Sequence, residues 1–148
     1  MSMDGFSFSS TQLDSEARIT IVASKWNAEF VNELVESGAA HLRDLGCKHL
    51  KIVYVPGAWE LVHATQLELI EADGVIAYGV VIRGETSHYE LISESAAQGL
   101  MQVSVAAKKP VAFGLIATEN LDQAKQRTNK SQLDKGKEIA QSLVEMLS

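Results

Sequence analysis

The chain has 148 residues, of which 46% are hydrophobic and 22% charged, a composition that fits one globular domain and excludes a disordered chain. Its formal net charge of −6 comes without a basic stripe, which argues against nucleic acid as the main partner. No apolar stretch approaches the roughly 20 residues that cross a bilayer, and a lone cysteine, Cys47, allows no internal disulfide.

These features predict a soluble, cytoplasmic protein that binds neither nucleic acid nor a membrane. The polar, Ser-rich start of the chain predicts a flexible N-terminal arm over residues 1–15, followed by a single domain over residues 16–148.

Short apolar runs alternate with helical patterns along this domain. Strands are expected over residues 18–24, 49–55, 74–82 and 110–117. Helices are expected between an N-cap at Asn27 and a stop at Gly46, and over residues 59–71, 88–109, 121–127 and 133–147. Strands that alternate with helices predict a four-stranded parallel sheet with helices on both faces. Right-handed crossovers narrow the topology to a flavodoxin-like, three-layer α/β sandwich.

Most of the unusual polar and aromatic residues follow the carboxyl ends of the predicted strands. They lie in residues 24–27, 55–60, 82–88 and 113–120. Open parallel sheets bind ligands beyond these strand ends, so the clustering predicts a small-molecule site at this edge.

The turn Arg-Gly-Glu-Thr-Ser-His at 83–88 links a buried strand to a helix. Its backbone N–H groups could bind an anion at the helix N-terminus, and His88 adds an imidazole that exchanges protons near neutral pH. Ser87 and Glu90 also match the Ser-x-x-Glu capping box, which needs no ligand. From the residues alone, anion binding and helix capping stay open, and His88 is either a surface residue or an acid–base group.

Two other loops also allow two interpretations each. The indole of Trp26 could stack on a flat heterocycle or pack under the next helix. The carboxylate of Glu60 could contact a ligand or stabilise the start of a helix. The histidines and Cys47 show no metal-ligand spacing, so no metal is expected.

Five motifs in order resemble the lumazine synthase family over about residues 19–147. They are Trp26-Asn27, Val-Pro-Gly-Ala-Trp-Glu-Leu at 55–61, Gly-Val-Val-Ile-Arg-Gly-Glu-Thr-Ser-His-Tyr at 79–89, Thr-Glu-Asn-Leu-Asp-Gln-Ala at 118–124 with Arg127, and Lys135-Gly136. The resemblance implies condensation of 5-amino-6-(ribitylamino)uracil with 3,4-dihydroxy-2-butanone 4-phosphate. The products are 6,7-dimethyl-8-ribityllumazine, phosphate and water, in riboflavin biosynthesis, and no cofactor or metal takes part.

The resemblance also implies roles for individual residues. Trp26 would stack on the pyrimidine ring, Glu60 would accept hydrogen bonds from the ribityl chain, and His88 would be the general acid/base. The other substrate-binding positions would be Asn27, Ala58, Trp59, Val81, Ile82, Glu85, Thr86, Phe113, Arg127 and Lys135.

In the family, the site forms only in an oligomer. Glu85 and Thr86 would hold the phosphate opposite Arg127, while Phe113 and Lys135 would close the pocket around the ring. Phe113, Arg127 and Lys135 come from the neighbouring subunit, which implies a homopentamer. Whether pentamers assemble further into an icosahedral shell stays open.

Two alternatives have the same fold. A non-catalytic flavin- or lumazine-binding module, or a shell-forming scaffold, would not need His88, Arg127 and Lys135 together, so their presence favours the enzyme. A flavodoxin-like binder of flavin phosphate would want a hydroxyl-rich loop after the first strand, and Ala23-Ser-Lys-Trp-Asn27 is poor in hydroxyls. The chain departs from many family members at residues 128–134, where it has no glycine.

Overall fold

The computed structural model describes residues 12–84 and 88–148. Its strands and helices alternate along the chain, as predicted. In chain order they are β1 (Arg18–Ser24), α1 (Ala28–Asp44), β2 (His49–Val55), α2 (Ala58–Glu68), β3 (Gly74–Ile82), α3 (Tyr89–Ala107), β4 (Val111–Thr118), α4 (Leu121–Thr128) and α5 (Lys135–Leu147). The strands form one parallel sheet in the order β2-β1-β3-β4. This arrangement confirms the flavodoxin-like α/β fold.

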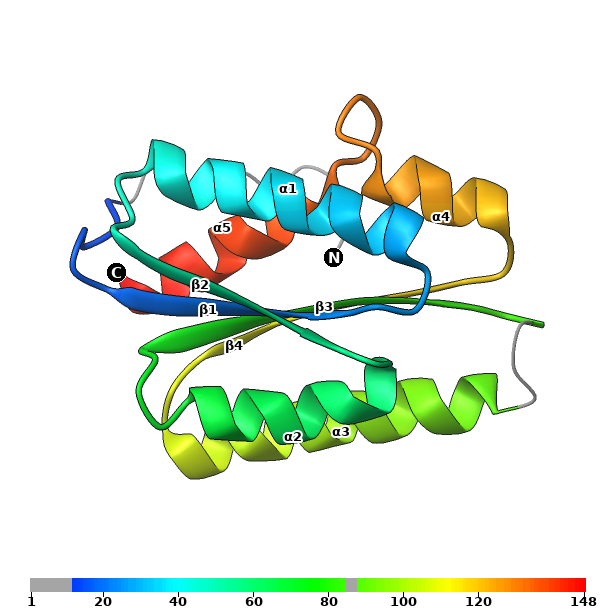
Figure 1. Ribbon diagram of the computed structural model, residues 1–148, viewed down its shortest axis with the longest axis horizontal. Coiled ribbons are helices and arrows are strands. Elements are labelled where there is room, and N and C mark those ends of the chain that lie inside the picture. The colour runs from blue at the N-terminus through cyan, green and yellow to red at the C-terminus, as the bar shows by residue number, and fades with distance from the viewer. Residues whose placement is uncertain (1–11, 85–87) are drawn as a thin grey trace.

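The sheet separates two layers of helices (Figure 1). Helices α1, α4 and α5 cover one face, and α2 and α3 cover the other. Successive side chains of a strand point to opposite faces, so Ile21 of β1 packs into the core under α1 and α5, while Val22 packs toward α2 and α3. Every residue of β3 is buried, as expected of a strand with neighbours on both sides and helices on both faces.

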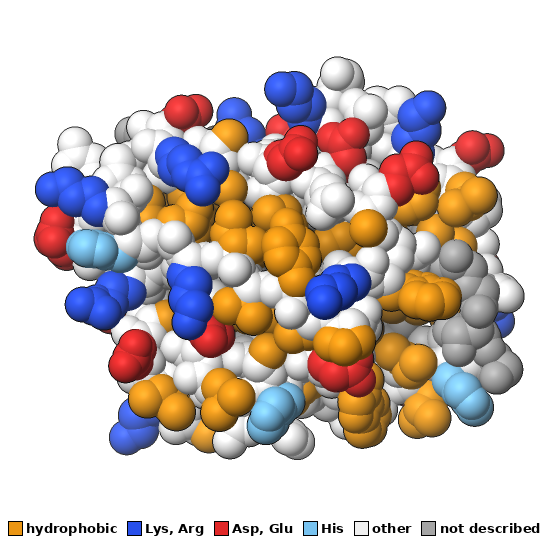
Figure 2. Space-filling model, viewed as in Figure 1, with side chains coloured by type: hydrophobic (Ala, Val, Ile, Leu, Met, Phe, Trp, Pro, Cys, Tyr) orange, Lys and Arg blue, Asp and Glu red, His pale blue; other side chains and the backbone are white. Residues whose placement is uncertain are grey.

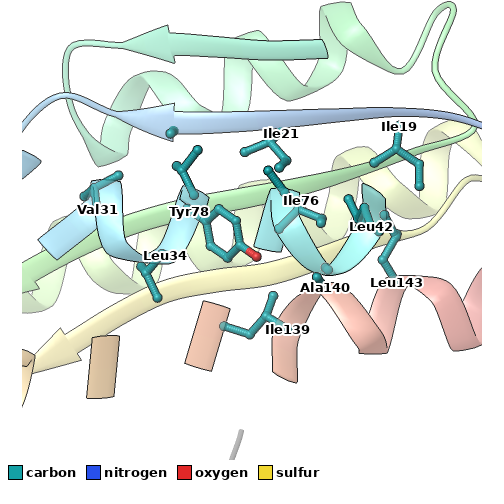
Figure 3. Packing of buried hydrophobic residues seen from close by; sticks show 14 of the residues in the cluster. Ile19, Ile21, Val31, Leu34, Leu42, Ile76, Tyr78, Ile139, Ala140 and Leu143 are labelled. Carbon is teal, nitrogen blue, oxygen red and sulfur yellow. The ribbon is translucent and has the colours of Figure 1, made fainter. Parts of the chain in front are cut away.

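Ahead of β1, Leu13 is buried in the core that β1 and β3 form with α1 and α5. Residues 1–11 of the predicted N-terminal arm lie outside the described residues. Figure 3 shows that core, where Ile76 and Tyr78 of β3 lie among side chains of α1 and α5 such as Leu34 and Ile139.

The predicted element ends differ from the structure by a few residues. Helix α2 ends at Glu68, before the predicted end at residue 71, and α5 starts at Lys135 instead of residue 133. The late start of α5 has a local cause. Residues 129–134 form a turn in which the Asp134 N–H donates to the Asn129 carbonyl at 3.1 Å. Asp134 itself is left-handed with φ +47°, so the helix cannot begin before Lys135.

Asn27 occupies the predicted N-cap position of α1, but its side chain does not cap the helix. Its backbone is left-handed with φ +59°, and its side chain makes no capping hydrogen bond. Capping requires an extended backbone, which directs the side chain at the free N–H groups of the first turn. Instead, Nδ2 of Asn27 donates to the Val80 carbonyl at 2.8 Å. The side chain therefore ties the β1–α1 loop to the end of β3.

Many large apolar side chains lie exposed on the surface. Figure 2 shows hydrophobic side chains across the middle of the displayed face, where β2 crosses in Figure 1, and charged side chains above them along α1. Further exposed apolar side chains lie on α2 and α3, among them Trp59, Leu67, Leu91, Met101 and Val105. Within residues 12–84 and 88–148, no helix is long and apolar enough to cross a membrane.

Candidate active site

The carboxyl ends of β1, β2 and β3 border a cleft of about 490 Å³. Its walls come from three segments of the sheet edge and from the first turns of α3. The lining residues are Trp26, Pro56, Gly57, Ala58, Trp59, Glu60, Val80, Val81, Ile82 and Ile92. Parallel sheets bind ligands at this edge, as the sequence predicted for this chain. The structure therefore brings Trp26, Ala58, Trp59, Glu60, Val81 and Ile82 together at the carboxyl ends of three strands.

The cleft has two exposed indoles, Trp26 on the loop after β1 and Trp59 in the first turn of α2. Trp26 is 62% exposed and Trp59 is 63% exposed. The interpretation in which Trp26 packs under the next helix is therefore wrong. Its backbone is nevertheless held, because the Trp26 N–H donates to the Pro56 carbonyl at 3.1 Å. A fixed backbone with an exposed ring provides a flat stacking surface at the mouth of a mostly apolar cleft.

Glu60 supports the start of α2. One of its carboxylate oxygens, Oε1, accepts a hydrogen bond from the Gly57 N–H at 2.8 Å, which is the bond that the third helical residue makes in a capping box; Gly57 has no side chain to make the reciprocal bond. The helix-supporting interpretation of Glu60 is thus confirmed. A carboxylate has two oxygens, each with two lone pairs, so this bond leaves acceptor capacity on a side chain that also lines the cleft.

In the turn after β3, Gly84 has φ +91°, a conformation that glycine adopts without strain. His88 is exposed and occupies the N-cap position of α3. It lies one helical turn before Ile92, which lines the cleft. Glu85, Thr86 and Ser87 lie outside the described residues, so the predicted phosphate contacts and the Ser87 part of the capping box stay predictions.

Arg83 has a role that the sequence left unexplained. Its guanidinium group lies 2.9 Å from the Glu90 carboxylate and 3.6 Å from the Glu119 carboxylate. It also lies 5.6 Å from the centre of the Tyr89 ring, within cation–π range. Arg83 thereby joins the end of β3 to the first turn of α3 and to the loop after β4.

Phe113, Arg127 and Lys135 do not border the cleft among the described residues. Arg127 lies on α4, where Nη1 donates to the Ala117 carbonyl at 3.1 Å. Lys135 starts α5, and its Nζ lies 2.7 Å from the Glu138 carboxylate. Both helices belong to the layer opposite α2 and α3 (Figure 1). Phe113 is 46% exposed on β4 and borders a separate groove between β4 and α5. The predicted site thus falls into two groups within one chain.

Pro56, Gly57, Val80 and Ile92 line the cleft but were not predicted as site residues. A signal existed for Ile92, because it lies four residues after His88 and so faces the same side of α3. The other three lie inside the quoted motifs, next to residues that were assigned.

Neither a metal nor a reactive thiol marks this site. In the part of the chain that the structure describes, no group of three or more His, Cys, Asp or Glu side chains could hold a metal ion. Cys47 lies before β2, at the opposite end of the sheet, with Sγ 3.9 Å from the Ala17 carbonyl. Burial raises the pKa of its thiol, which disfavours the reactive thiolate.

The sequence matches to known proteins span both the cleft residues and the group of Phe113, Arg127 and Lys135. The family model described as 6,7-dimethyl-8-ribityllumazine synthase matches residues 16–148. The chain is 36% identical over 134 residues to the 6,7-dimethyl-8-ribityllumazine synthase of Limosilactobacillus reuteri, covering 89% of this chain and 88% of the relative. It is 39% identical over 134 residues to the protein of that name from Bdellovibrio bacteriovorus, covering 88% of this chain and 73% of the relative. For the one from Rhodopirellula baltica, identity is 38% over 134 residues, with 88% and 86% covered.

Proposed function

The chain belongs to the 6,7-dimethyl-8-ribityllumazine synthase family, and we propose that it is a transferase that catalyses the reaction of that family. It condenses 5-amino-6-(ribitylamino)uracil with 3,4-dihydroxy-2-butanone 4-phosphate to give 6,7-dimethyl-8-ribityllumazine, phosphate and water. The observation that carries this proposal is the convergence of three family motifs on one cleft at the ligand-binding edge of the sheet.

The cleft suits the pyrimidine substrate. Its ring would stack on the exposed indole of Trp26, and its ribityl hydroxyls would donate to the carboxylate of Glu60. Backbone groups of Ala58, Trp59, Val81 and Ile82, at the walls of the cleft, would bind the ring edge and the ribityl chain. Asn27 contributes from outside, because its amide holds the Val80 carbonyl and so fixes the strand end beside Val81.

His88 would move the protons. The amine attacks the ketone and expels water to form a Schiff base, phosphate leaves, and ring closure expels a second water. Each of these steps takes up or releases a proton, which an imidazole can do near neutral pH. His88 lies one turn of α3 before Ile92, which lines the cleft, and from there its imidazole would serve the reacting groups.

Binding of the phosphate would come from the other group of residues. Arg127, with the backbone of Glu85 and the hydroxyl of Thr86, would bind the phosphate of the butanone substrate. The phosphate leaves already charged, so cations and N–H donors suffice and no strong acid is needed. Holding two substrates in contact would supply much of the rate gain.

The site would be completed by a neighbouring subunit in a homopentamer. Two observations support this proposal. Arg127 and Lys135 lie in the helix layer opposite to the one that borders the cleft. In addition, α2 and α3 expose large apolar side chains, with Met101 63% and Val105 73% exposed, which is typical of surfaces that a partner covers. The cytoplasm stays our prediction for its location.

The proposal is tested by mixing the purified protein with both substrates and following lumazine formation by absorbance and fluorescence. We expect a rate well above the uncatalysed condensation. The excess should vanish in Arg127→Ala, while Lys130→Ala, in the neighbouring exposed turn, serves as a charge-matched control. Pyrimidine binding without excess product would instead identify a non-catalytic binder or scaffold.

A further inference from the structure

Lys135 holds an unusual position for a lysine. Its side chain is only 10% exposed, and its ammonium group lies 2.7 Å from the Glu138 carboxylate one turn along α5. A buried, paired ammonium cannot search for a ligand as a surface lysine does. The position of Lys135 in an active site therefore depends on the position of the first turn of α5.

Three contacts from outside α5 fix this turn. The Tyr78 hydroxyl of β3 donates to the Gly136 carbonyl at 2.6 Å. The Ser37 hydroxyl of α1 bonds to the Asp134 carboxylate. Gly136 also packs directly on α1, because a Cβ there would lie 2.5 Å from the Leu34 carbonyl oxygen. Of the three, only the Tyr78 bond joins the turn to the central sheet.

Tyr78 is itself held firmly. It is fully buried in the middle of β3, and Figure 3 shows its ring between Leu34 of α1 and Ile139 and Ala140 of α5. A methyl group at Gly38 would overlap its hydroxyl, and a Cβ at Gly114 would lie 2.6 Å from its ring. The ring thus fills a slot that two glycines leave open. Burial, with the nearby charge of Asp134, raises the pKa of Tyr78, so the hydroxyl stays a donor.

We propose that Tyr78 is a positioning residue for the condensation, because its hydroxyl holds the Gly136 carbonyl and so places Lys135 for the active site that Lys135 completes. This inference rests on the proposed function. Filling the core does not require the hydroxyl, since a phenyl ring fills the same slot without a polar group to satisfy. Val81 and Ile82, at the end of the same strand, line the cleft. Strand β3 therefore positions both the wall of the cleft and, through Tyr78, the side chain of Lys135.

The test is Tyr78→Phe, which keeps the ring and removes only the hydroxyl, made both in the wild type and in Lys135→Met. The matched control is Thr20→Val, which removes another buried hydroxyl from the sheet, one that bonds to Glu68 on the other helix layer. The measurements are kcat and KM for each substrate, and pyrimidine binding by tryptophan fluorescence. Both tryptophans of the chain border the cleft, so their emission reports on that site.

We expect Tyr78→Phe to lower kcat/KM for the pyrimidine about tenfold, since small misplacements of site groups are costly. In Lys135→Met the same change should have less than about a twofold effect, because the group it positions is gone. Thr20→Val should stay within about twofold of the wild type, although it also loses stability. A loss of stability in Tyr78→Phe with unchanged kinetics, or an equal kinetic loss in both backgrounds, would overturn the proposal.

Two further outcomes are separable. If Tyr78→Phe does not fold, Ser37→Ala, which releases Asp134 from α1, is judged in both backgrounds by the same criterion. If the wild type forms no lumazine above the uncatalysed rate, the proposed function fails. The comparison of the two backgrounds is then made on pyrimidine affinity alone, and an affinity that Tyr78→Phe leaves unchanged in the wild type overturns the positioning role.

Discussion

Replacing Asn27 by alanine should loosen the connection between the β1–α1 loop and the end of β3. Its amide donates to the Val80 carbonyl at 2.8 Å, and its backbone has φ +59°. A hydrogen bond contributes about 1 kcal/mol net, and a left-handed backbone costs an ordinary residue about 1 kcal/mol more than it costs asparagine. Asn27→Ala should therefore lower the free energy of unfolding by about 2 kcal/mol. Asn27→Gly accepts the backbone and should lose only about 1 kcal/mol.

The assay is urea unfolding followed by circular dichroism, at one fixed protein concentration because the stability of an oligomer depends on it. Comparable slopes against urea would show that the variants unfold from equally compact states. Asn32→Ala, on the exposed side of α1, is the control and should unfold like the wild type. If the glycine variant is destabilised as much as the alanine variant, the argument from the left-handed backbone is wrong. If neither variant is destabilised, the bond to Val80 contributes nothing.

Three further predictions concern the cleft and the thiol. Trp26→Ala should weaken pyrimidine binding at least tenfold, about 1.4 kcal/mol, as measured by calorimetry. Trp26→Phe keeps a stacking ring and should keep most of the affinity. If neither variant changes the affinity, Trp26 does not belong to the site. Glu60→Gln should keep the capping bond and the unfolding midpoint but weaken pyrimidine binding. Glu60→Ala should weaken binding and also lower the free energy of unfolding by about 1 kcal/mol. Equal affinity in the wild type and Glu60→Gln would limit Glu60 to helix support. Burial raises the pKa of Cys47, so its thiolate forms at higher pH in the folded protein than in the unfolded chain. A thiol reagent at pH 8 should therefore react more slowly with the folded protein than with the urea-unfolded chain. Equal rates would contradict the burial argument.

The sheet could be predicted because its signals are local. β1, β2 and β3 are apolar runs that end at turn residues, and all three were predicted with the bounds that the structure shows. A turn was likewise predicted at residues 83–88 from its polar run, and Gly84 within it has φ +91°. Burial on both faces leaves a continuous apolar run in the sequence, so β3 could be predicted from its own residues.

The missed features depend on partners far away in the sequence. The conformation of Asn27 is set with Val80, 53 residues later, and no pattern around Asn27 encodes that bond. Glu119, one of the two carboxylate partners of Arg83, lies on a loop that only the folded sheet brings near, so that part of the role of Arg83 was not foreseen. The bond from Tyr78 to Gly136 spans 58 residues and was not foreseen for the same reason.

The candidate site was predictable in part. Loops at one edge of a parallel sheet must lie together, so the grouping of Trp26, Glu60 and Val81 follows from the strand pattern. Arg127 and Lys135 follow from the family resemblance alone. Nothing in the periodicity of α4 or α5 connects them to the cleft, and one chain does not bring them there.

The central claim is that the cleft of one subunit and Arg127 of another form each active site. It is tested most directly by co-expressing two inactive chains with different tags, one carrying Trp26→Ala with Glu60→Ala and the other Arg127→Ala, and purifying mixed oligomers. In a ring of randomly mixed subunits, about one quarter of the sites join an intact cleft to an intact Arg127, so about one quarter of the wild-type rate should return. Mixed oligomers with no more activity than the two parents would show that the site is not shared, and would contradict the account.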